Sequence, residues 1–570
     1  MVINNLYNKK DEITIENYLQ KFRINDCKEF INPTGKYLES PYLYKNIVNA
    51  VNLLKWFYLD KESTVYILSD SGDTDGITSA VIMYQYMKLL NDDWDIKILI
   101  HEGKERGLQD EKLLKQILEY PRDLLIIPDS GTNDKEQVDL IYEKTETQVI
   151  VLDHHDLVTP IQRGVLINNQ IEANCQKNGS GCLVTHKFLQ ALDKELNINY
   201  SGQFIDLVAL SLISDSMDMS EQENRTYYHF GLESIDKVNN TFLKKCIEKF
   251  INKNNYTKDN YTQKDLAFNV IPKFNSISRS TNIELKQKLF SAFLDLEDDL
   301  DEILKLCEES HKNQRKIVDD IINKNMDKIN DISSNNLIIF ASDDIPKSYS
   351  GLVCGKIMNL CGNKPTLTGS IKDGEFIGSL RSPIPIREEL NNNELVEWCV
   401  GHEEASGIKI KEKNLQPLID YYNGLKIDYS PHITVLNSYT IKSLPKYLFG
   451  LFEPYNALFG KGIDEPRFFI DKISFYPKDI DILGADKRTL KLKVGEISLL
   501  IFNCTRQNKI DLGLGYYEKD KFIEKRKSTK LEMCCVGSLN INNWNDKKYN
   551  QIIVDNFEIK EYNKSIEDLI

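Results

Sequence analysis

Short apolar runs alternate with longer amphipathic stretches between Thr64 and about Leu232. The apolar runs occupy 65–68, 96–100, 124–127 and 149–152. The stretches at 77–90 and 183–192 repeat apolar residues at intervals of three and four, which is helical spacing. This alternation predicts an α/β domain in which crossover helices connect the strands of a parallel sheet.

The pattern changes three times after this segment. Residues 282–332 are strongly charged with apolar residues at helical spacing, which predicts long helices between two lobes. A second α/β segment covers about 337–425, and short strands bounded by turns begin near Ser443, which favours a small β-barrel. We therefore predict five regions: a helical extension (1–58), a parallel-sheet domain (59–240), a helical connector (241–334), a smaller α/β domain (335–430) and a barrel domain (440–570).

Composition narrows the class of protein. The chain has no apolar run of eighteen residues and no secretion signal at its start, so we expect a soluble, cytoplasmic protein without membrane contact. Eleven cysteines without a C-x-x-C pair argue against a zinc cluster and a disulfide framework. The net charge of −14 requires any nucleic-acid path to be local, although a site built from carboxylates would add negative charge that bound cations offset.

Acidic and histidine side chains gather at the ends of the predicted strands. Asp73 and Asp75 share the turn after the first strand, Asp129 follows the third, and His154 and His155 follow the fourth. Asp215 closes an apolar helix at 207–213. Any one of these motifs is more often an ordinary turn, but four in compatible places point to a pair of divalent ions, manganese or magnesium, that clamp a water and a phosphate.

The order of these motifs, with the literal Asp153-His154-His155, resembles the DHH phosphoesterases, whose first motif usually reads H-x-D-x-D-G or D-x-D-x-D-G. The resemblance implies a DHH catalytic domain at 59–240 and a DHH-associated domain at 335–430. It also implies that two Mn²⁺ or Mg²⁺ ions are held by Asp73, Asp75, Asp129, His154 and Asp215. Asp129 would bridge the ions, and His155 would lie beside the ligands or near the substrate phosphate. Ser71 departs from the family, so a water or the adjacent Asp70 would complete one metal's coordination.

Further segments resemble the RecJ branch of this superfamily. They are Asn224-Arg225, Pro272-Lys273-Phe274-Asn275 with Arg279, Gly378-Ser379-Leu380-Arg381-Ser382, and Gly401-His402-Glu403-Glu404-Ala405-Ser406-Gly407. By this resemblance Ser379 and Arg381 would hold the substrate's terminal phosphate, and His402 would contact the scissile phosphate. The remaining substrate-binding residues that it implies are Arg225, Asn275, Arg279 and Gly401. Val400 replaces the first glycine of the usual G-G-H, which would alter backbone approach there.

The C-terminal segment from Phe452 to Phe468, with Asn540 and Trp544 further on, is similar to the OB fold of RecJ. OB folds bind single strands by stacking bases on aromatic residues beside a basic groove. The candidates for that groove are Tyr516, Tyr517, Lys519, Lys521, Lys525, Arg526 and Lys527, and the alternative interpretation is a solvated charged loop. The segment 101–108 loosely matches a basic RecJ loop, in which Lys104 or Arg106 would contact the strand.

The resemblance implies a 5′ to 3′ exonuclease specific for single-stranded DNA, which acts in repair, recombination or replication. Single-stranded DNA is the expected partner, a single-strand binding protein or helicase is expected by analogy, and we expect a monomer of bacterial or phage origin. Two alternatives remain open. One is a DHH phosphodiesterase for oligoribonucleotides or cyclic dinucleotides, and the other is a scaffold without catalysis, which Ser71 would favour.

Overall fold

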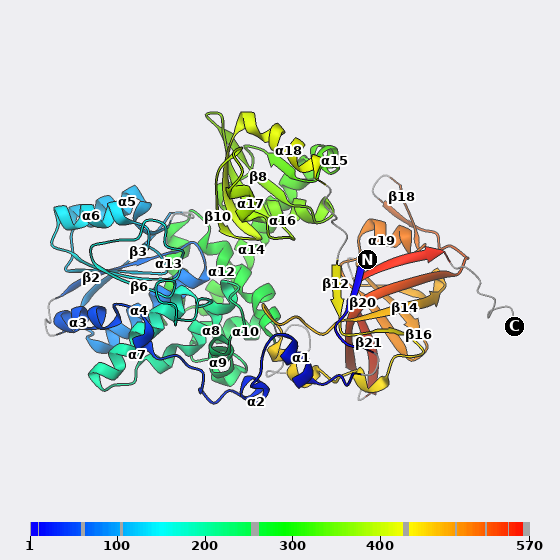
Figure 1. Cartoon of the computed structure of the whole chain (residues 1–570), viewed down its shortest axis with the longest axis horizontal. Coiled ribbons are helices and arrows are strands. Elements are labelled where there is room, and N and C mark those ends of the chain that lie inside the picture. Colours follow the sequence, from blue (N-terminus) through cyan, green and yellow to red (C-terminus); the bar gives the residue numbers. More distant parts are fainter. Residues whose placement is uncertain are drawn as a thin grey trace. The chain divides into compact units, whose positions relative to one another are not determined.

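The computed structural model describes residues 2–8, 11–58, 63–102, 106–251, 261–425, 432–484, 487–518, 521–544 and 547–561 (Figure 1). It divides into two compact units. The large unit is Thr34–Tyr429, and the small unit combines Met1–Pro33 with Ser430–Ile570. No helix in the described ranges is both long enough and apolar enough to cross a membrane.

A parallel sheet forms the first part of the large unit. Its strand order is β3-β2-β4-β5-β6, and every neighbouring pair is parallel. The strands are β2 (Thr64–Ser69), β3 (Asp95–Ile100), β4 (Leu124–Pro128), β5 (Gln148–Asp153) and β6 (Val165–Asn168). The predicted α/β class and its first four strands are confirmed, whereas β6 was not predicted. Strands β4 and β5 are almost entirely apolar because both faces of the sheet are covered.

Helices cover the two faces of this sheet. One face packs against α5 (Glu111–Glu119) and α6 (Lys135–Lys144) in a shared apolar core. Helices α4 (Thr74–Leu90) and α7 (Gly181–Leu196), which pack against each other, lie on the other face, with α3 (Ile47–Tyr58) beside α7 (Figure 1). As a result, the carboxyl ends of the strands and the start of α4 meet at one edge, where ligands of α/β sheets collect.

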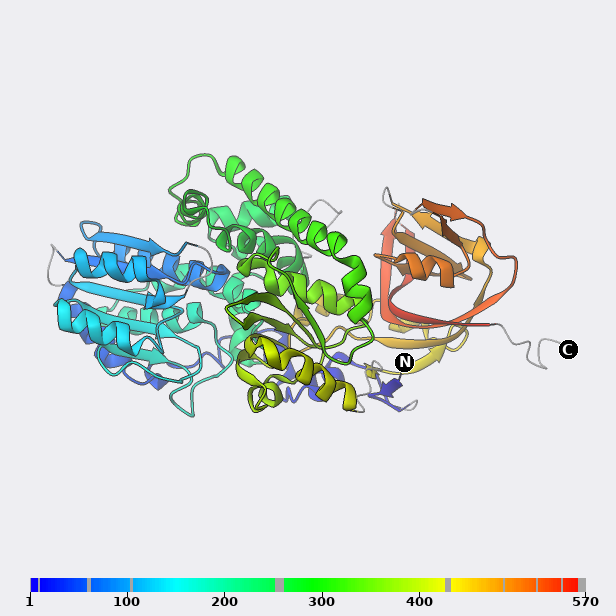
Figure 2. The same ribbon diagram turned by 90° about the horizontal axis from the view of Figure 1, so that it is seen from above.

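Helices α8 (Ile205–Ser214) and α9 (Gln222–Gly231) pack together after the sheet, within the range predicted for the parallel-sheet domain. The predicted helical connector contains α10 (Thr241–Phe250), α13 (Ile283–Phe293) and α15 (Met326–Ile332), and its helix α12 (Ile271–Ser278) packs on α14. Helix α14 (Leu300–Lys324) is the long green helix of Figure 2.

A second five-stranded sheet follows, with strand order β10-β11-β9-β8-β7. Its strands are β7 (Ile338–Ala341), β8 (Thr366–Lys372), β9 (Glu375–Arg381), β10 (Val396–His402) and β11 (Ala405–Lys411), and only β7–β8 is a parallel pair. One face forms an apolar core with α17 (Arg387–Asn391) and α18 (Leu415–Gly424). Helix α16 (Ser350–Leu360) packs against β8 and β9. The predicted smaller α/β domain is therefore present.

The small unit is built on a seven-stranded sheet with strand order β13-β14-β20-β21-β17-β16-β15. These strands are β13 (Ser438–Thr440), β14 (Phe468–Phe475), β15 (Ile480–Leu483), β16 (Thr489–Val494), β17 (Ile497–Ile501), β20 (Leu531–Trp544) and β21 (Lys547–Glu561). The prediction of a β-rich C-terminal domain is confirmed.

The first 33 residues belong to the small unit, although the sequence pattern suggested one helical extension over 1–58. Strand β1 (Val2–Asn5) pairs in parallel with β12 (His432–Val435), and Tyr18 of α1 (Ile15–Lys21) packs edge-on against Phe452 at 5.7 Å. The Tyr18 hydroxyl donates to the Asp464 carbonyl at 2.8 Å. A strand at this terminus pairs with a segment more than 400 residues away, which no local period can reveal.

Candidate active site

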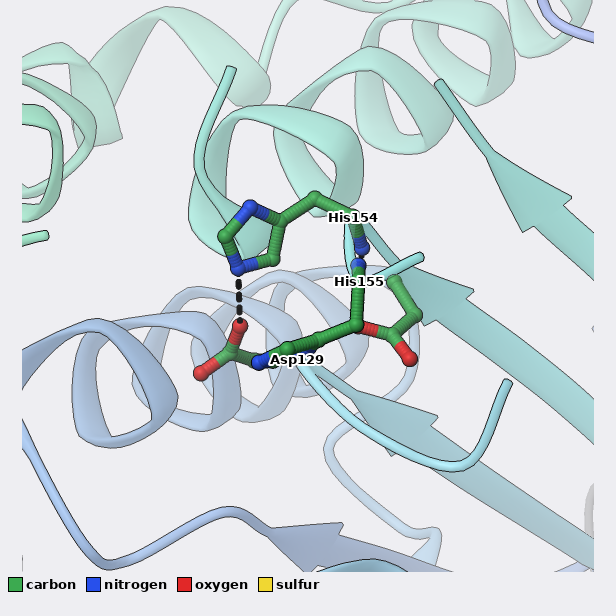
Figure 3. A group of neighbouring side chains, drawn as sticks. Asp129, His154 and His155 are labelled. Atoms are coloured by element: carbon green, nitrogen blue, oxygen red, sulfur yellow. Dashed lines mark hydrogen bonds and ion pairs between the residues drawn. The ribbon is translucent and has the colours of Figure 1, made fainter. Parts of the chain in front are cut away.

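Four of the five predicted metal ligands converge on one point at the carboxyl edge of the parallel sheet. Nε2 of His154 lies 3.3 Å from Oδ1 of Asp129, 3.6 Å from Oδ2 of Asp215 and 3.9 Å from Oδ2 of Asp75. Figure 3 shows the His154 ring directed at the Asp129 carboxylate, with His155 alongside. These residues come from the loops after β4 and β5, the first turn of α4 and the end of α8.

Local backbone features set each of these side chains. Asp75 lies in the first turn of α4 and accepts hydrogen bonds from the backbone N–H groups of Gly181 and Cys182 at 2.8 and 2.9 Å. Asp129 has a φ of 65°, a left-handed conformation that suits aspartate in a tight turn. Gly181 has no Cβ, and one built there would lie 2.2 Å from Oδ1 of Asp129. The chain therefore needs glycine at 181 to let the start of α7 approach this carboxylate.

The donor set fits a divalent cation. Oδ1 of Asp129 and Oδ2 of Asp215 are buried, and neither atom has a hydrogen-bond partner within the described residues. Burial raises the pKa of Asp215 to about 7, and burial together with Asp75 and Asp73 raises the pKa of Asp129 well above its usual range. A bound cation would offset both the burial and the like charges. Carboxylate oxygens with one imidazole suit manganese or magnesium.

Asp73, the fifth predicted ligand, is the N-cap of α4 and forms an ion pair with Arg106. Nη2 of Arg106 lies 3.4 Å from Oδ2 of Asp73, and its Nε lies 3.5 Å from Oδ2 of Asp70. Nη1 of Arg106 lies 2.8 Å from Nε2 of His155. Burial raises the pKa of Asp73, but Arg106 and Arg279 outweigh burial and hold it below its usual value. Arg106 was one of two candidates in its loop, and the other, Lys104, lies outside the described residues.

Ser71 does not face this pair of carboxylates. Its buried Oγ accepts a hydrogen bond from the backbone N–H of His101 at 3.0 Å. Asp70 is fully buried, and apart from the ion pair with Arg106 its Oδ2 has no hydrogen-bond partner within the described part of the chain. Of the two ways to replace the missing ligand that the sequence left open, this arrangement favours Asp70.

His155 is held by the carboxylate that precedes it in the triplet. Its Nδ1 donates to Oδ1 of Asp153 at 2.7 Å, and Asp153 also accepts the N–H of Thr132 at 3.0 Å. Burial lowers the pKa of His155, but Asp153 outweighs burial and raises it to about 9. Asp153 therefore fixes the orientation of this ring beside the ligand cluster.

Replacing Arg106 by alanine should make the free energy of unfolding depend more strongly on divalent ions. The variant loses the guanidinium that neutralises Asp70 and Asp73, so without metal its free energy of unfolding should fall by about 1–2 kcal/mol. Thermal unfolding with EDTA and with Mn²⁺ measures this, and Mn²⁺ should restore most of the loss. Arg163→Ala is the control, because Arg163 is similarly exposed and pairs with Asp139. An equal loss in both conditions would contradict the neutralising role of Arg106.

Helix α12 supplies two of the predicted substrate residues. Oδ1 of Asn275 accepts from both the N–H and the Oγ1 of Thr74, at 3.0 and 2.8 Å, so Asn275 fixes the start of α4 between Asp73 and Asp75. Arg279 ends the helix with a buried Nε that has no hydrogen-bond partner in the described residues. Burial lowers the pKa of Arg279, opposed by Asp73. A half-buried arginine with a buried, unused Nε donor is suited to a phosphate.

The predicted terminal-phosphate residues lie on strand β9. Oγ of Ser379 shares a hydrogen bond with Oγ of Ser350 at 2.7 Å, and Nη1 of Arg381 donates to the Leu380 carbonyl at 2.7 Å. A Cβ added to Gly351 would lie 2.5 Å from Nη2 of Arg381. Gly351 therefore makes room for the guanidinium, a role that the sequence did not indicate because it depends on a contact between α16 and β9.

His402 and Gly401 end strand β10. Gly401 has a φ of 133°, and a Cβ there would lie 2.9 Å from the Ala405 carbonyl oxygen, so glycine is required by both conformation and space. The His402 backbone pairs with Ala405, and the position of its side chain lies outside what the structure describes. The role of His402 at the scissile phosphate stays a prediction.

Arg225, a predicted substrate residue, is held in an ion pair, and its role at the substrate stays a prediction. It is 1% exposed, and its Nη2 lies 2.6 Å from Oε1 of Glu233. Glu233 also pairs with His229 and Lys237, so Arg225 belongs to a group of ion pairs at the end of α9.

Only some of the residues predicted to line the nucleic-acid groove of the small unit are exposed. Tyr516, on the hairpin of β18 (Gly515–Glu518) and β19 (Lys521–Glu524), is exposed, as are Lys521, Lys525 and Lys527. Tyr517 lies under the Arg506 guanidinium at 5.1 Å. Arg526 donates to the carbonyls of Pro477 and Ile480 and pairs with Glu524, so its guanidinium is held by the small unit itself. Lys519 and the Trp544 side chain lie outside the described residues.

Comparisons with known proteins agree with this site and fold. Residues 64–212 match the DHH family, N-terminal domain, and residues 452–556 match the RecJ OB domain. A putative SPbeta prophage-derived single-strand DNA-specific exonuclease, YorK of Bacillus subtilis, is 27% identical over 534 residues, which cover 88% of this chain and 90% of that protein. Thermus thermophilus RecJ is 24% identical over 414 residues, which cover 70% of this chain and 58% of that protein.

Solved structures of RecJ have a fold similar to that of this chain. The crystal structure of RecJ from Thermus thermophilus in complex with Mn²⁺ matches with a TM-score of 0.72 at 20% identity, over 98% of this chain and 80% of that one. The Mg²⁺ complex matches with a TM-score of 0.66. The chain therefore carries a DHH domain at residues 64–212 followed by a RecJ OB domain at residues 452–556. Its fold is that of the RecJ structures.

Proposed function

We propose that this protein is a metal-dependent exonuclease that hydrolyses phosphodiester bonds of single-stranded DNA from the 5′ end. The observation that carries the proposal is the convergence of Asp75, Asp129 and Asp215 on His154, in a chain that also has the RecJ OB domain. The prophage and Thermus relatives, described as exonucleases specific for single-stranded DNA, support the substrate.

Different residues of the cluster would bind the metal ions and position the reacting groups. Asp75, Asp129, His154 and Asp215 would hold one Mn²⁺ or Mg²⁺ ion, and Asp73 with Asp70 would take part in holding a second. When bound, such ions activate a water and neutralise charge on the phosphate. Asp129, as the expected bridging carboxylate, and His155, oriented by Asp153, would position the water and the scissile phosphate, which His402 would also contact. These roles are proposed from the geometry of the cluster.

A second group would hold the end of the strand. Arg381 and Ser379 would bind the terminal phosphate, with Gly401 allowing close approach to the backbone beside them. Arg279 lies within electrostatic reach of both Asp73 and Arg381. It would thus neutralise phosphates between the terminal site and the metal centre, which a chain of net charge −14 needs at this place.

The cellular setting follows from the same proposal. All eleven cysteines are buried, which suits the reducing cytoplasm of a bacterium, and the prophage relative supports a bacterial or phage origin. We propose a monomer that acts in repair, recombination or replication. A helicase or a single-strand binding protein would work beside it, because an enzyme for single strands needs the duplex to be opened.

Strand polarity and substrate class can be tested together. DNA labelled at its 3′ end and phosphorylated at its 5′ end should shorten progressively in Mn²⁺, with the label kept on ever smaller strands. Blunt duplex DNA should stay intact. Release of the labelled terminal nucleotide first would overturn the 5′ to 3′ direction. Cleavage of dinucleotides alone would point to a small-substrate phosphodiesterase, and binding without cleavage would point to a scaffold.

A further inference from the structure

The sheet face that carries Ser379 and Arg381 continues into an exposed apolar surface. In the antiparallel register, Ser379 of β9 is paired with Gly407 of β11, which is paired with Val400 of β10. Two residues further along each strand, Ile377 of β9 is paired with Lys409 of β11, which is paired with Trp398 of β10. Because side chains two residues apart on a strand share a face, these residues lie on the face of the proposed phosphate site.

This surface is open, in contrast to the opposite face of the same sheet. The exposed fractions are 38% for Trp398, 62% for Val400 and 45% for Ile377, whereas Phe376, Leu380, Cys399 and Ile408 on the other face are fully buried. Large apolar side chains left exposed together on one sheet face mark a binding surface.

The Trp398 ring is directed toward the phosphate site. A Cβ built on Gly407 would lie 3.4 Å from Cζ3 and 3.8 Å from Cη2 of the indole, so the ring extends across β11 above Gly407. Gly407 is the direct neighbour of Ser379, one strand spacing of about 5 Å away. The glycine thus leaves space for the six-membered ring of the indole over β11, within the reach of one nucleotide from Ser379.

The charges on this surface favour a base over a phosphate. Lys409 is on the same face, but its Nζ pairs with Glu375 at 2.9 Å and with Glu397 at 3.2 Å. Two carboxylates neutralise this lysine, which makes the surface around Trp398 unsuited to a backbone phosphate. An aromatic ring next to a phosphate-binding arginine matches the two parts of a nucleotide, a flat base and an anionic group.

We propose that Trp398, supported by Gly407 and flanked by Val400 and Ile377, is a stacking platform for the first bases of the strand whose terminal phosphate is held by Ser379 and Arg381. This inference rests on the proposed function, and it adds a base-contacting site that accepts any base, since every base has a stacking face.

The test compares strands with and without bases at the 5′ end. Wild-type protein, Trp398→Ala and Trp398→Phe are titrated in EDTA, which prevents hydrolysis, with fluorescent 5′-phosphorylated oligonucleotides. One oligonucleotide has normal bases, and the other has abasic sites at its first three nucleotides. Trp56→Ala is the control, because Trp56 is 64% exposed on α3, away from this sheet.

Trp398→Ala should bind the normal strand about tenfold more weakly than wild type and the abasic strand equally well, because one base–aromatic contact is lost. Trp398→Phe should recover most of the affinity. Equal binding of both strands by wild type and Trp398→Ala would overturn the platform, as would an equal loss on both strands, which a structural role or a protein partner at this surface predicts. Wild-type protein that binds no single strand would overturn the proposed function with it.

Discussion

Asp129→Asn is expected to lower the rate of single-strand hydrolysis by about a thousandfold or more, on the scale of losing a group that stabilises transition-state charge. Asp129 lies 3.3 Å from His154 and is the carboxylate expected to bridge the metals. Asparagine keeps the size of the side chain and tolerates the φ of 65° at this position, so the turn after β4 should persist. Single-turnover cleavage of 5′-phosphorylated DNA in Mn²⁺ measures the loss.

The same variant should separate catalysis from folding. Burial and the neighbouring aspartates raise the pKa of Asp129, so its ionised form disfavours the folded state when no metal is bound. Without divalent ions, asparagine should therefore leave the melting temperature equal or higher. With Mn²⁺ the order should reverse, because wild type gains stability by binding metal and the variant gains less. A variant that unfolds more easily in EDTA would show that Asp129 is structural, and one that still cleaves would remove it from the centre.

Arg381→Ala is expected to lower kcat/KM on 5′-phosphorylated DNA by about a hundredfold, since a charge-assisted hydrogen bond to phosphate contributes about 1.5–3 kcal/mol. On DNA with a 5′-hydroxyl the loss should be small, so the preference for a phosphorylated end should disappear. Gly351→Ala should act in the same direction, because its Cβ would lie 2.5 Å from Nη2 of Arg381.

Gly355 provides the control on the same helix. A Cβ at Gly355 meets nothing within 4 Å, so Gly355→Ala should leave both substrates unaffected. Equal losses on phosphorylated and hydroxyl-ended strands in Arg381→Ala would contradict a terminal-phosphate site on β9.

The ligand cluster could be foreseen because its chemistry follows a strong local signal. Asp75, Asp129 and His154 each come soon after an apolar strand, and parallel strands bring their carboxyl ends to one edge. Asp215 ends a helix, for which the strand-end rule gives no guidance; it was included because it closes an apolar segment, and the family resemblance also implies it as a ligand. Strand β6, only four residues long, gave too short an apolar run to predict.

Other features depend on contacts between distant segments. Arg225 and Arg106 are both arginines in motif-like segments. Arg225 forms a buried ion pair with Glu233, whereas Arg106 contacts Asp70, Asp73 and His155 in the site. Nothing in their local sequence distinguishes them. The exposed ring of Trp398 and the space above Gly407 depend on the register of three strands. Hydrophobic alternation does not fix this register, because a shift of two residues leaves the same side chains on the buried face.

The most direct test of the central claim couples metal binding to hydrolysis in the same sample. Protein stripped with EDTA is titrated with Mn²⁺, bound ions are counted by electron paramagnetic resonance, and cleavage of 5′-phosphorylated single-stranded DNA is measured at each point. Cleavage should be absent in stripped protein and should rise with occupancy of the cluster around His154. In His154→Ala, both binding and cleavage should fall together. Cleavage that persists in stripped protein, or in a variant that no longer binds Mn²⁺, would contradict a metal-dependent exonuclease.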